Sequence, residues 1–277
     1  MQLLDGKKVA EKILQEVQND IATMEVKPGL AVILIGDDPA SQVYVNRKHK
    51  TCQKVGMYSE VIRKNANVTQ EEVLVLIEDL NQRKDIHGIL VQLPLPKHLD
   101  EEVILRAVDE NKDVDGFHLI NTGKLFRGQD ALTPCTPTGV IRLLKEYDIN
   151  MQGANAVVIG RSNIVGKPMA HLLLGQNATV TICHSKTKDI EKFCQKADIV
   201  VAAVGIAQLV KASWIKPGAC IVDVGINRLN DGKLVGDVDF EDCKTKAGYL
   251  TPVPGGVGPL TIAVLLQNTV KACKKIT

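Results

Sequence analysis

The sequence predicts an α/β protein of two domains, each a mainly parallel sheet with flanking helices. Its 277 residues exceed the roughly 100–200 residues that are usual for one domain. Short, continuous apolar runs alternate with segments of helical period, and such runs are typical of strands buried on both faces of a parallel sheet. The alternation occurs twice, on either side of a stretch that contains Gly and Pro, 116–139.

The first half contains two clear helix-start signals beside its apolar runs. Asp38-Pro39 is a pair that favours the first turn of a helix, and Gly56 is placed to end that helix. Thr69 and Glu72 have the spacing of a capping box. The expected elements are helix 6–24, strand 30–36, helix 39–55, strand 58–63, a helix from 69, strand 86–93 and helix 100–110.

The second half is expected to contain a four-stranded sheet. A helix over 138–147 comes first, and the last periodic segment, 259–273, is a strongly apolar helix that should be packed. A return to the first domain is the natural place for that helix. The apolar runs between the two helices are 155–160, 179–183, 198–204 and 219–225.

Composition excludes several classes of protein. The chain has 45% apolar and 24% charged residues, as ordinary globular proteins do, and its net charge of +2 is too weak for a nucleic-acid binder. Neither a signal peptide nor a run of about 18 apolar residues is present. The seven cysteines form no Cys-x-x-Cys pair and the histidines lack metal-ligand spacing. We therefore expect a cytoplasmic protein without metal, nucleic acid or membrane as partner.

A glycine-containing turn follows the first apolar run of the second half. Gly160 ends the strand and Gly166 opens the next helix, in "GRSNIVG", which departs from the usual G-x-G-x-x-G spacing. The physical logic is unchanged, because a sharp turn directs the amides of a helix N-terminus at a phosphate. This predicts a Rossmann-type dinucleotide site, with a purely structural turn as the alternative.

The end of the next strand favours NADP over NAD. NAD sites often place a carboxylate there, on the ribose hydroxyls. This chain instead has His184, Ser185 and Lys186, with no acid before Asp189. A 2′-phosphate is repelled by an acid and held by hydroxyl and cationic groups, and Arg161 is a further candidate. An ordinary exposed loop is the alternative interpretation.

Tyr44 and Lys48 lie four residues apart on the predicted helix 39–55. This spacing places both on one helix face. For an arbitrary helical lysine a solvated face is the more frequent outcome. Ligands of α/β sheets gather at the carboxyl ends of strands, and the helix follows such an end, which favours a functional pair.

Several motifs occur together and in one order: "YVNRKHK", "GILVQLPLP", "KDVDGFH", "PCTPTG", "VIGRSNIVGKP", "VDVGIN", "VGDVDF" and "TPVPGGVGPLT". Together they resemble the bifunctional methylenetetrahydrofolate dehydrogenase/methenyltetrahydrofolate cyclohydrolase family, over essentially the whole chain. One departure is mild: "GPLT" stands where many members have "GPMT", which exchanges two similar apolar residues.

The resemblance implies roles for particular residues. Tyr44 would stack on the folate, Lys48 would be the central cyclohydrolase residue, Gln92 would support that lysine and Asp115 would hold the pterin; these four form the implied catalytic set. The further substrate-binding residues that it implies are Val91, Leu93, Pro254, Gly255, Gly256 and Leu260. The implied cofactor-binding residues are Gly160, Arg161, Ser162, Ile164, Gly166, His184, Ser185 and Ile226.

The chemistry is consistent with these residue types. A carboxylate such as Asp115 can accept two N–H groups of an aminopyrimidine edge, although an aspartate beside Gly116 is also a common turn residue. Hydride transfer needs only close positioning of two rings. Hydrolysis needs a base, and burial beside a cationic folate should lower the pKa of Lys48. Cys135 lacks nucleophile partners and is interpreted as structural.

We therefore expect a folate-binding catalytic domain over 1–137 and an NADP-binding Rossmann-type domain over 138–258, with a ligand cleft between them and helix 259–277 packed on the first. The expected activity oxidises 5,10-methylenetetrahydrofolate and hydrolyses the methenyl product to 10-formyltetrahydrofolate. A dehydrogenase-only member, a nucleotide-sensing module and another two-domain NADP-dependent oxidoreductase of shikimate-dehydrogenase type are the alternatives. The resemblance also implies a homodimer and a place in one-carbon metabolism and purine biosynthesis.

Overall fold

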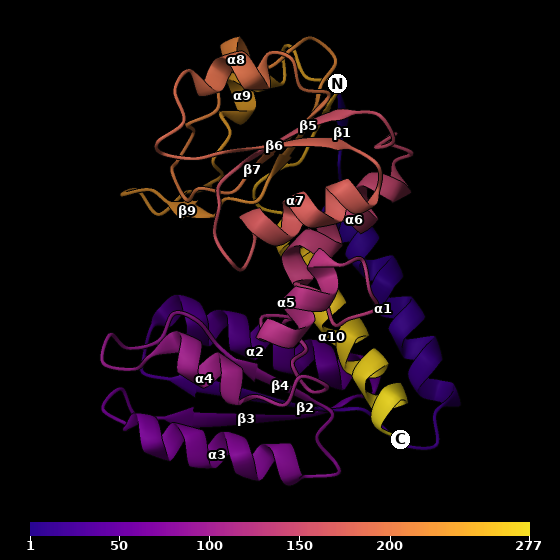
Figure 1. The fold of residues 1–277 in the computed structure, drawn as a ribbon, viewed down its shortest axis with the longest axis vertical. Helices are drawn as coiled ribbons and strands as arrows, with labels where there is room; N and C mark the ends of the chain where they lie inside the picture. The colour runs from indigo at the N-terminus through magenta and orange to yellow at the C-terminus, as the bar shows by residue number, and fades with distance from the viewer. The chain divides into compact units, whose positions relative to one another are not determined.

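The computed structural model describes residues 1–277 and divides into two compact units (Figure 1). Unit 1 comprises Met1–Glu11 with Thr136–Val264, and unit 2 comprises Lys12–Cys135 with Leu265–Thr277. The three boundaries fall inside helices α1 (Gly6–Thr23), α6 (Cys135–Glu146) and α10 (Val257–Ile276). The first eleven residues thus group with the second half of the chain, and the last thirteen group with the first half.

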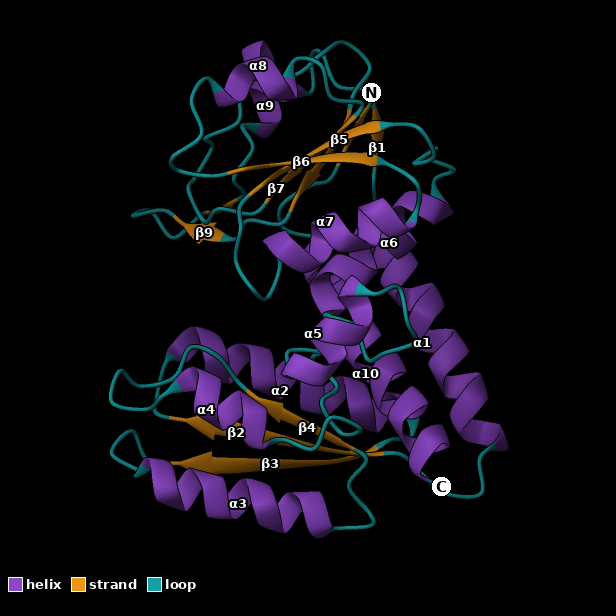
Figure 2. Cartoon of the chain, in the orientation of Figure 1, coloured by secondary structure: helices purple, strands orange, loops and turns teal.

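Unit 2 is built on a three-stranded parallel sheet in the order β3-β2-β4 (Figure 2). The strands are β2 (Gly29–Ile35), β3 (Tyr58–Lys64) and β4 (Gly88–Val91). The chain moves from β2 to β3 through α2 (Pro39–Val55) and returns past β2 to β4 through α3 (Gln70–Gln82). Right-handed crossovers in opposite directions place these two helices on opposite faces. The carboxyl ends of β2 and β4 therefore form the switch point at which α/β sheets bind ligands.

Alternation along β2 divides its side chains between the two faces. Ala31, Ile33 and Ile35 belong to one apolar core with residues of α3 and of α4 (Glu101–Ala107). All seven residues of β2 are buried, so the strand is covered on both sides, as its continuous apolar run predicts.

The predicted helix signals of this unit are confirmed. Asp38 accepts a hydrogen bond from the Ser41 amide at 2.7 Å at the start of α2, and Gly56 ends that helix with φ 82°. Thr69 and Glu72 form the reciprocal capping box of α3. The local sequence thus determines where both helices begin.

The stretch 116–139 is more ordered than the sequence indicates. It contains α5 (Leu119–Phe126), and α6 (Cys135–Glu146) begins three residues before its predicted start at 138. The helix α5 has only eight residues and contains Gly123, which is a poor helix former. Its start is capped by His118, whose Nδ1 accepts from the Ile120 amide at 3.2 Å, a signal that periodicity does not detect.

Unit 1 contains a six-stranded, entirely parallel sheet in the order β1-β11-β8-β7-β5-β6. Helices α8 (Ile190–Cys194) and α9 (Phe240–Cys243) lie on one side of it, and α6 and α7 (Gly166–Gly175) lie on the other (Figure 2). The predicted α/β class with mainly parallel sheets is confirmed. The central strands are β5 (Asn155–Ile159), β6 (Thr179–Cys183), β7 (Ile199–Ala202) and β8 (Cys220–Asp223).

The elements that the sequence did not predict in unit 1 are all short. The edge strand β1 (Gln2–Leu3) pairs with β11 (Tyr249–Leu250), and β9 (Asn227–Arg228) pairs with β10 (Leu234–Val235) as a separate ribbon. Two residues cannot establish a period, so these strands depend on tertiary pairing. The seven cysteines are free and buried, and none of the helices has the length and apolar character of a membrane span.

Lys112 provides a C-terminal cap for α3 from a distant part of the chain. Its side chain is 6% exposed, and Nζ donates to the carbonyls of Leu80, Asn81 and Arg83 at 3.2, 2.7 and 2.7 Å. A cation is favourable at a helix C-terminus, where carbonyls lack partners. The residue also opens the segment that leads to Asp115.

Replacing Lys112 with methionine should therefore lower the free energy of unfolding by about 2–4 kcal/mol, because the carbonyls of Leu80, Asn81 and Arg83 lose their buried donor. Chemical denaturation measures this change. The matched control is Lys84→Met at an exposed lysine, where a change within about 0.5 kcal/mol is expected. Equal effects at the two positions would contradict the capping role.

Candidate active site

Unit 2 holds a buried amine at the inner face of α2. Lys48 is 4% exposed, and its Nζ donates to Oε1 of Gln92 at 3.0 Å. Gln92 follows β4 directly and its Nε2 donates to the Leu93 carbonyl at 2.7 Å. That second bond determines which end of the amide faces the lysine. The strand end therefore presents a fixed acceptor to the amine.

Tyr44 completes the arrangement on the same helix. Lys48 Nζ lies 4.7 Å from the centroid of the Tyr44 ring, within the distance at which an aromatic face attracts a cation. The half-buried ring thus lies beside the amine one helical turn away. The two residues share a face as their spacing predicts, and neither belongs to the solvated side of α2.

Electrostatics in the site favour neutral groups. Burial lowers the pKa of Lys48, and the nearby Asp115, Cys135 and Cys52 oppose this change. Burial also raises the pKa of Asp115, while Lys48 and a hydrogen bond with Cys135 act in the opposite direction. Desolvation dominates for both groups. The amine is thereby moved towards the form that can accept a proton.

The segment that carries Asp115 is held by a second aspartate. Asp113 is 5% exposed and accepts from the amides of Phe117 and His118 at 3.1 and 2.9 Å and from Nδ2 of Asn121 at 2.9 Å. Burial raises the pKa of Asp113 to about 7, against the effect of these donors. The result is a fixed turn immediately after Asp115.

Two residues near Asp115 were not assigned to the site from sequence. Cys135 is fully enclosed, its Sγ donates to the Val114 carbonyl at 3.3 Å, and the charges of Asp115 and Lys48 act on its pKa, which burial raises well above the ordinary value. Asn268 of α10 donates from Nδ2 to the carbonyls of Val114 and Thr133 at 2.9 and 3.0 Å. The sequence signal that could have identified Asn268 is a single amide side chain on the buried face of an apolar helix.

The other predicted folate-binding residues have different surroundings. In unit 2 the Val91 side chain is 3% exposed and packs in the core, whereas Leu93 is half-buried. In unit 1 Leu260 is also fully buried. Pro254 is exposed, and the Gly255 carbonyl accepts from the Lys7 amide at 3.1 Å.

The backbone of Gly256 lies so close to Gly6 that only glycine fits at position 6. A Cβ at Gly6 would lie 1.8 Å from the Gly256 carbonyl oxygen, so the two backbones are in close contact. The "PVPGG" loop is therefore held against the start of α1 within unit 1.

The predicted phosphate loop lies at the switch point of the larger sheet, where the chain leaves β5 for β6 and then crosses to β7. Gly160 has φ 126°, and a Cβ there would lie 2.2 Å from the Ala203 carbonyl. A Cβ at Gly166 would lie 2.3 Å from the Gly160 carbonyl. Both glycines are sterically required for this tight turn. Ser162 Oγ accepts from the amides of Val165 and Gly166, both at 3.2 Å, and so ties the turn to the first residue of α7.

The remaining predicted cofactor residues line the same edge of the sheet. Ile159 pairs with Cys183, and the Gly160 amide donates to the Cys183 carbonyl at 2.8 Å, which places His184 beside the loop. Arg161, Ser162 and Ser185 are exposed, Ile164 and His184 are half-buried, and Ile226 is 60% exposed. A glycine turn flanked by an arginine and a serine, without a carboxylate, fits the phosphates of a dinucleotide.

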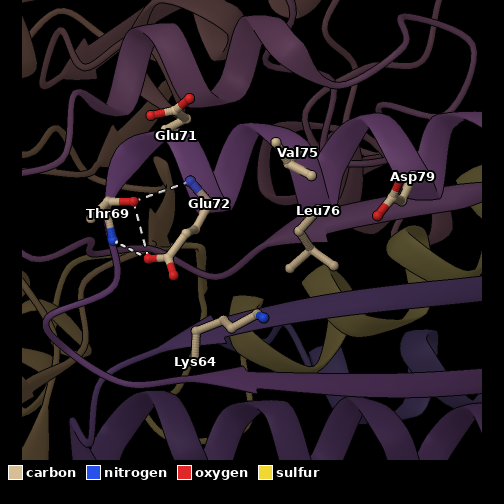
Figure 3. Close-up of a pocket in the computed structure, with 7 residues that line it drawn as sticks. All are labelled: Lys64, Thr69, Glu71, Glu72, Val75, Leu76 and Asp79. Carbon is tan, nitrogen blue, oxygen red and sulfur yellow. Dashed lines mark hydrogen bonds between the residues drawn. The ribbon is translucent and has the colours of Figure 1, made fainter.

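Two pockets of the structure lie away from the Lys48 site. One of about 440 Å³ lies on α3 and is lined by Lys64, Thr69, Glu71, Glu72, Val75, Leu76 and Asp79 (Figure 3). Thr69 and Glu72 in this pocket already bond to each other in the capping box of α3. A second of about 190 Å³ lies in unit 1 beside Asp223 and Pro252. No group of three His, Cys, Asp or Glu side chains is arranged to hold a metal ion.

Two α/β units, one with a buried lysine and one with a glycine turn at its sheet edge, define a nucleotide-dependent enzyme. Family models match both halves: the tetrahydrofolate dehydrogenase/cyclohydrolase catalytic domain over residues 4–115, and the NAD(P)-binding domain of the same family over residues 134–277. The chain belongs to the tetrahydrofolate dehydrogenase/cyclohydrolase family, which confirms the resemblance found in the sequence.

Individual relatives agree over the full length. The bifunctional protein FolD of Campylobacter concisus is 56% identical over 277 residues, which cover 99% of this chain and 98% of that protein. The crystal structure of the bifunctional enzyme FolD from Campylobacter jejuni has a TM-score of 0.98 at 51% identity and covers 99% of both chains. The Trypanosoma brucei FolD structure, complexed with NADP cofactor and inhibitor, has a TM-score of 0.95 at 39% identity, covering 99% and 97%.

Proposed function

We propose that this chain oxidises 5,10-methylenetetrahydrofolate to the 5,10-methenyl form with NADP and hydrolyses that product to 10-formyltetrahydrofolate. The observation that supports it most is the buried Lys48, because burial to 4% exposure lowers the pKa of the amine and so favours the neutral form that can act as a base. Gln92 beside it is an acceptor that cannot titrate. Family membership supports both activities.

The hydrolytic step uses the amine as a general base. Water attacks the electrophilic methenyl carbon, and Lys48 Nζ accepts the proton that the water loses. The carbon–nitrogen bond of the resulting adduct then breaks, and the proton returns to the departing ring nitrogen. Gln92 orients Nζ through its carbonyl oxygen, 3.0 Å away. Tyr44 offers its ring for stacking on the folate, and the carboxyl of Asp115 accepts the N–H groups of the pterin.

For the oxidative step, bound NADP supplies the hydride acceptor. The protein contributes the turn at Gly160 and Gly166, and Arg161 and Ser185 would bind the 2′-phosphate. No acid or base is required, since the folate nitrogen stabilises the cationic product. A dehydrogenase-only enzyme would need no buried lysine, so the Lys48–Gln92 pair favours the bifunctional alternative.

The setting of the enzyme is also a proposal. A homodimer is supported by family resemblance and by the open edge of the larger sheet, where β6 has no neighbour on one side. Ile182 on that strand and Leu174 on α7 are 39% and 59% exposed, and exposed strand edges are commonly covered. A cytoplasmic location and the supply of formyl groups to purine biosynthesis follow from the same resemblance.

Lys48→Met should reduce hydrolysis of methenyltetrahydrofolate by at least about 100-fold, because general-base catalysis contributes roughly 10²–10⁴. The loss of the methenyl absorbance measures this rate, and folate binding should remain substantial. Lys50→Met, at an exposed lysine of the same helix, is the control and should hydrolyse normally. Normal hydrolysis in the Lys48 variant would refute the base assignment.

Gln92→Glu should move the acid limb of the hydrolysis pH–rate profile to higher pH. A carboxylate beside the amine raises the pKa of Lys48, so a higher pH is needed to produce the neutral base. We expect a movement of about one pH unit or more. Gln92→Met removes the acceptor without adding charge and should slow hydrolysis without this upward movement. An unmoved limb in the glutamate variant would exclude Lys48 as the titrating base.

Arg161→Ala should raise the KM for NADP by about tenfold or more while changing the KM for NAD little, because only NADP carries the 2′-phosphate that the guanidinium can bind. Steady-state rates with each nucleotide provide the comparison within one variant. Better turnover of NAD than of NADP by the unmodified enzyme would contradict the cofactor preference.

A further inference from the structure

Two buried aspartates of unit 1 take no part in the chemistry proposed above. Asp223, at the end of β8, is 3% exposed, and Asp237 is 0% exposed. Burial of a carboxylate is costly unless its oxygens accept hydrogen bonds. The donors here are amide groups of the loops at the carboxyl edge of the six-stranded sheet, the edge to which the cofactor residues were assigned.

Asp237 joins the loops that follow two neighbouring strands. Its Oδ2 accepts from the amides of Val204 and Gly205 at 2.6 and 3.0 Å, and its Oδ1 accepts from Nδ2 of Asn227 at 2.9 Å. Val204 and Gly205 follow β7, and Asn227 follows β8, which pairs with β7 in parallel. One carboxylate therefore connects both loops.

Asp223 holds Asp237 in turn. Its Oδ1 accepts from the amides of Gly225 and Asp237, and its Oδ2 accepts from the amide of Val238, each at 2.9 Å. The Asp223 amide itself donates to Oγ1 of Thr251 at 2.7 Å. The backbone on either side of the Asp237 carboxylate is thus fixed.

The two glycines in these motifs are present because the carboxylates lie against them. A Cβ at Gly225 would lie 2.2 Å from Asp237 Oδ1, and a Cβ at Gly236 would lie 1.8 Å from Asp223 Oδ2. Such distances exclude any side chain without movement of the loops. The motifs "VDVGIN" and "VGDVDF" therefore encode one packed unit, although Asp223 and Asp237 are 14 positions apart in the sequence.

This unit is directly connected to the phosphate loop. Val204 follows Ala203, whose carbonyl is so close to Gly160 that a Cβ there would lie 2.2 Å away. Ile226 stands between Gly225, held by Asp223, and Asn227, held by Asp237. An exposed apolar side chain with both neighbours fixed is suited to packing against a flat ring.

We infer that Asp237 is a positioning residue for nicotinamide nucleotide binding: through Val204, Gly205 and Asn227 it sets the loops after β7 and β8 that border the phosphate turn. It does not touch the reacting atoms. The inference rests on the proposed function, because it concerns the same nucleotide site. Asp223 supports it by holding the backbone of Asp237.

The test compares three variants of the full chain. Asp237→Ala removes all three acceptor contacts. Asn227→Ala removes only the connection to the loop after β8 and leaves Val204 and Gly205 bonded. Asp239→Ala is the matched control in the same motif, because the Asp239 carboxylate caps α9 and pairs with Lys211 at 2.9 Å, whereas Val204, Gly205 and Asn227 donate to Asp237 instead.

The readouts are the Kd for NADP by direct titration, the rate of hydrolysis of preformed methenyltetrahydrofolate without nucleotide, and the melting temperature. Asp237→Ala should raise the Kd at least about tenfold, since the backbone amides of Val204 and Gly205 and the side-chain amide of Asn227 all lose their acceptor. Asn227→Ala should raise it about threefold, the result expected for one neutral hydrogen bond. Asp239→Ala should leave it within about twofold. Hydrolysis should stay within about twofold of the unmodified rate in all three.

A double variant separates positioning from general destabilisation. If Asn227 acts only through Asp237, adding Asn227→Ala to Asp237→Ala should raise the Kd no further. An unchanged Kd for NADP in Asn227→Ala would overturn the inference. This result would be decisive even if Asp237→Ala failed to fold. An equal rise of the Kd in Asp239→Ala would also overturn it. A loss of hydrolysis that parallels the loss of nucleotide binding would do the same. An unmodified protein that does not bind NADP would instead contradict the proposed function itself.

Discussion

The burial of one amine is the constraint on which the active site depends. Lys48 is 4% exposed on α2, and its hydrogen bond to Gln92 replaces the water that it loses. Desolvation lowers the pKa of Lys48, which places the charged form at a disadvantage. The same burial that costs folding free energy therefore produces a group able to accept a proton. An exposed lysine at this position would be protonated at neutral pH.

The surrounding scaffold keeps that amine and its partners in place. Gln92 stands at a strand end with its amide fixed by the Leu93 carbonyl. The segment of Asp115 is held by the capping contacts of Lys112 and by the buried Asp113. In unit 1 the same device recurs, because buried carboxylates again fix the loops at the carboxyl edge of the sheet. In both sheets, therefore, the strand ends are rigid, and hydrogen bonds to buried side chains fix the loops that carry the proposed site residues.

Much of the fold follows from local sequence. Continuous apolar runs located β2 and the central strands of unit 1, and caps such as Asp38 and Thr69 located helix starts. The strands β1 and β11 were missed because two residues carry no period and pair only in the tertiary structure. The lysine–glutamine contact joins residues 44 positions apart, and Asn268 lies more than 130 positions from the carbonyls that it binds. Spacing along the chain indicates a shared face of one helix, as for Tyr44 and Lys48, but not contacts between elements.

The central claim is that Lys48 is an amine whose pKa is lowered by burial, and it can be measured without turnover. NMR titration of the lysine side chains, with the Lys48 signal assigned by its absence from Lys48→Met, gives the pKa directly. Lys48 should titrate clearly below the ordinary lysine value of about 10.4, and its titration should move to higher pH in Gln92→Glu. A Lys48 signal that titrates with the exposed lysines would contradict it.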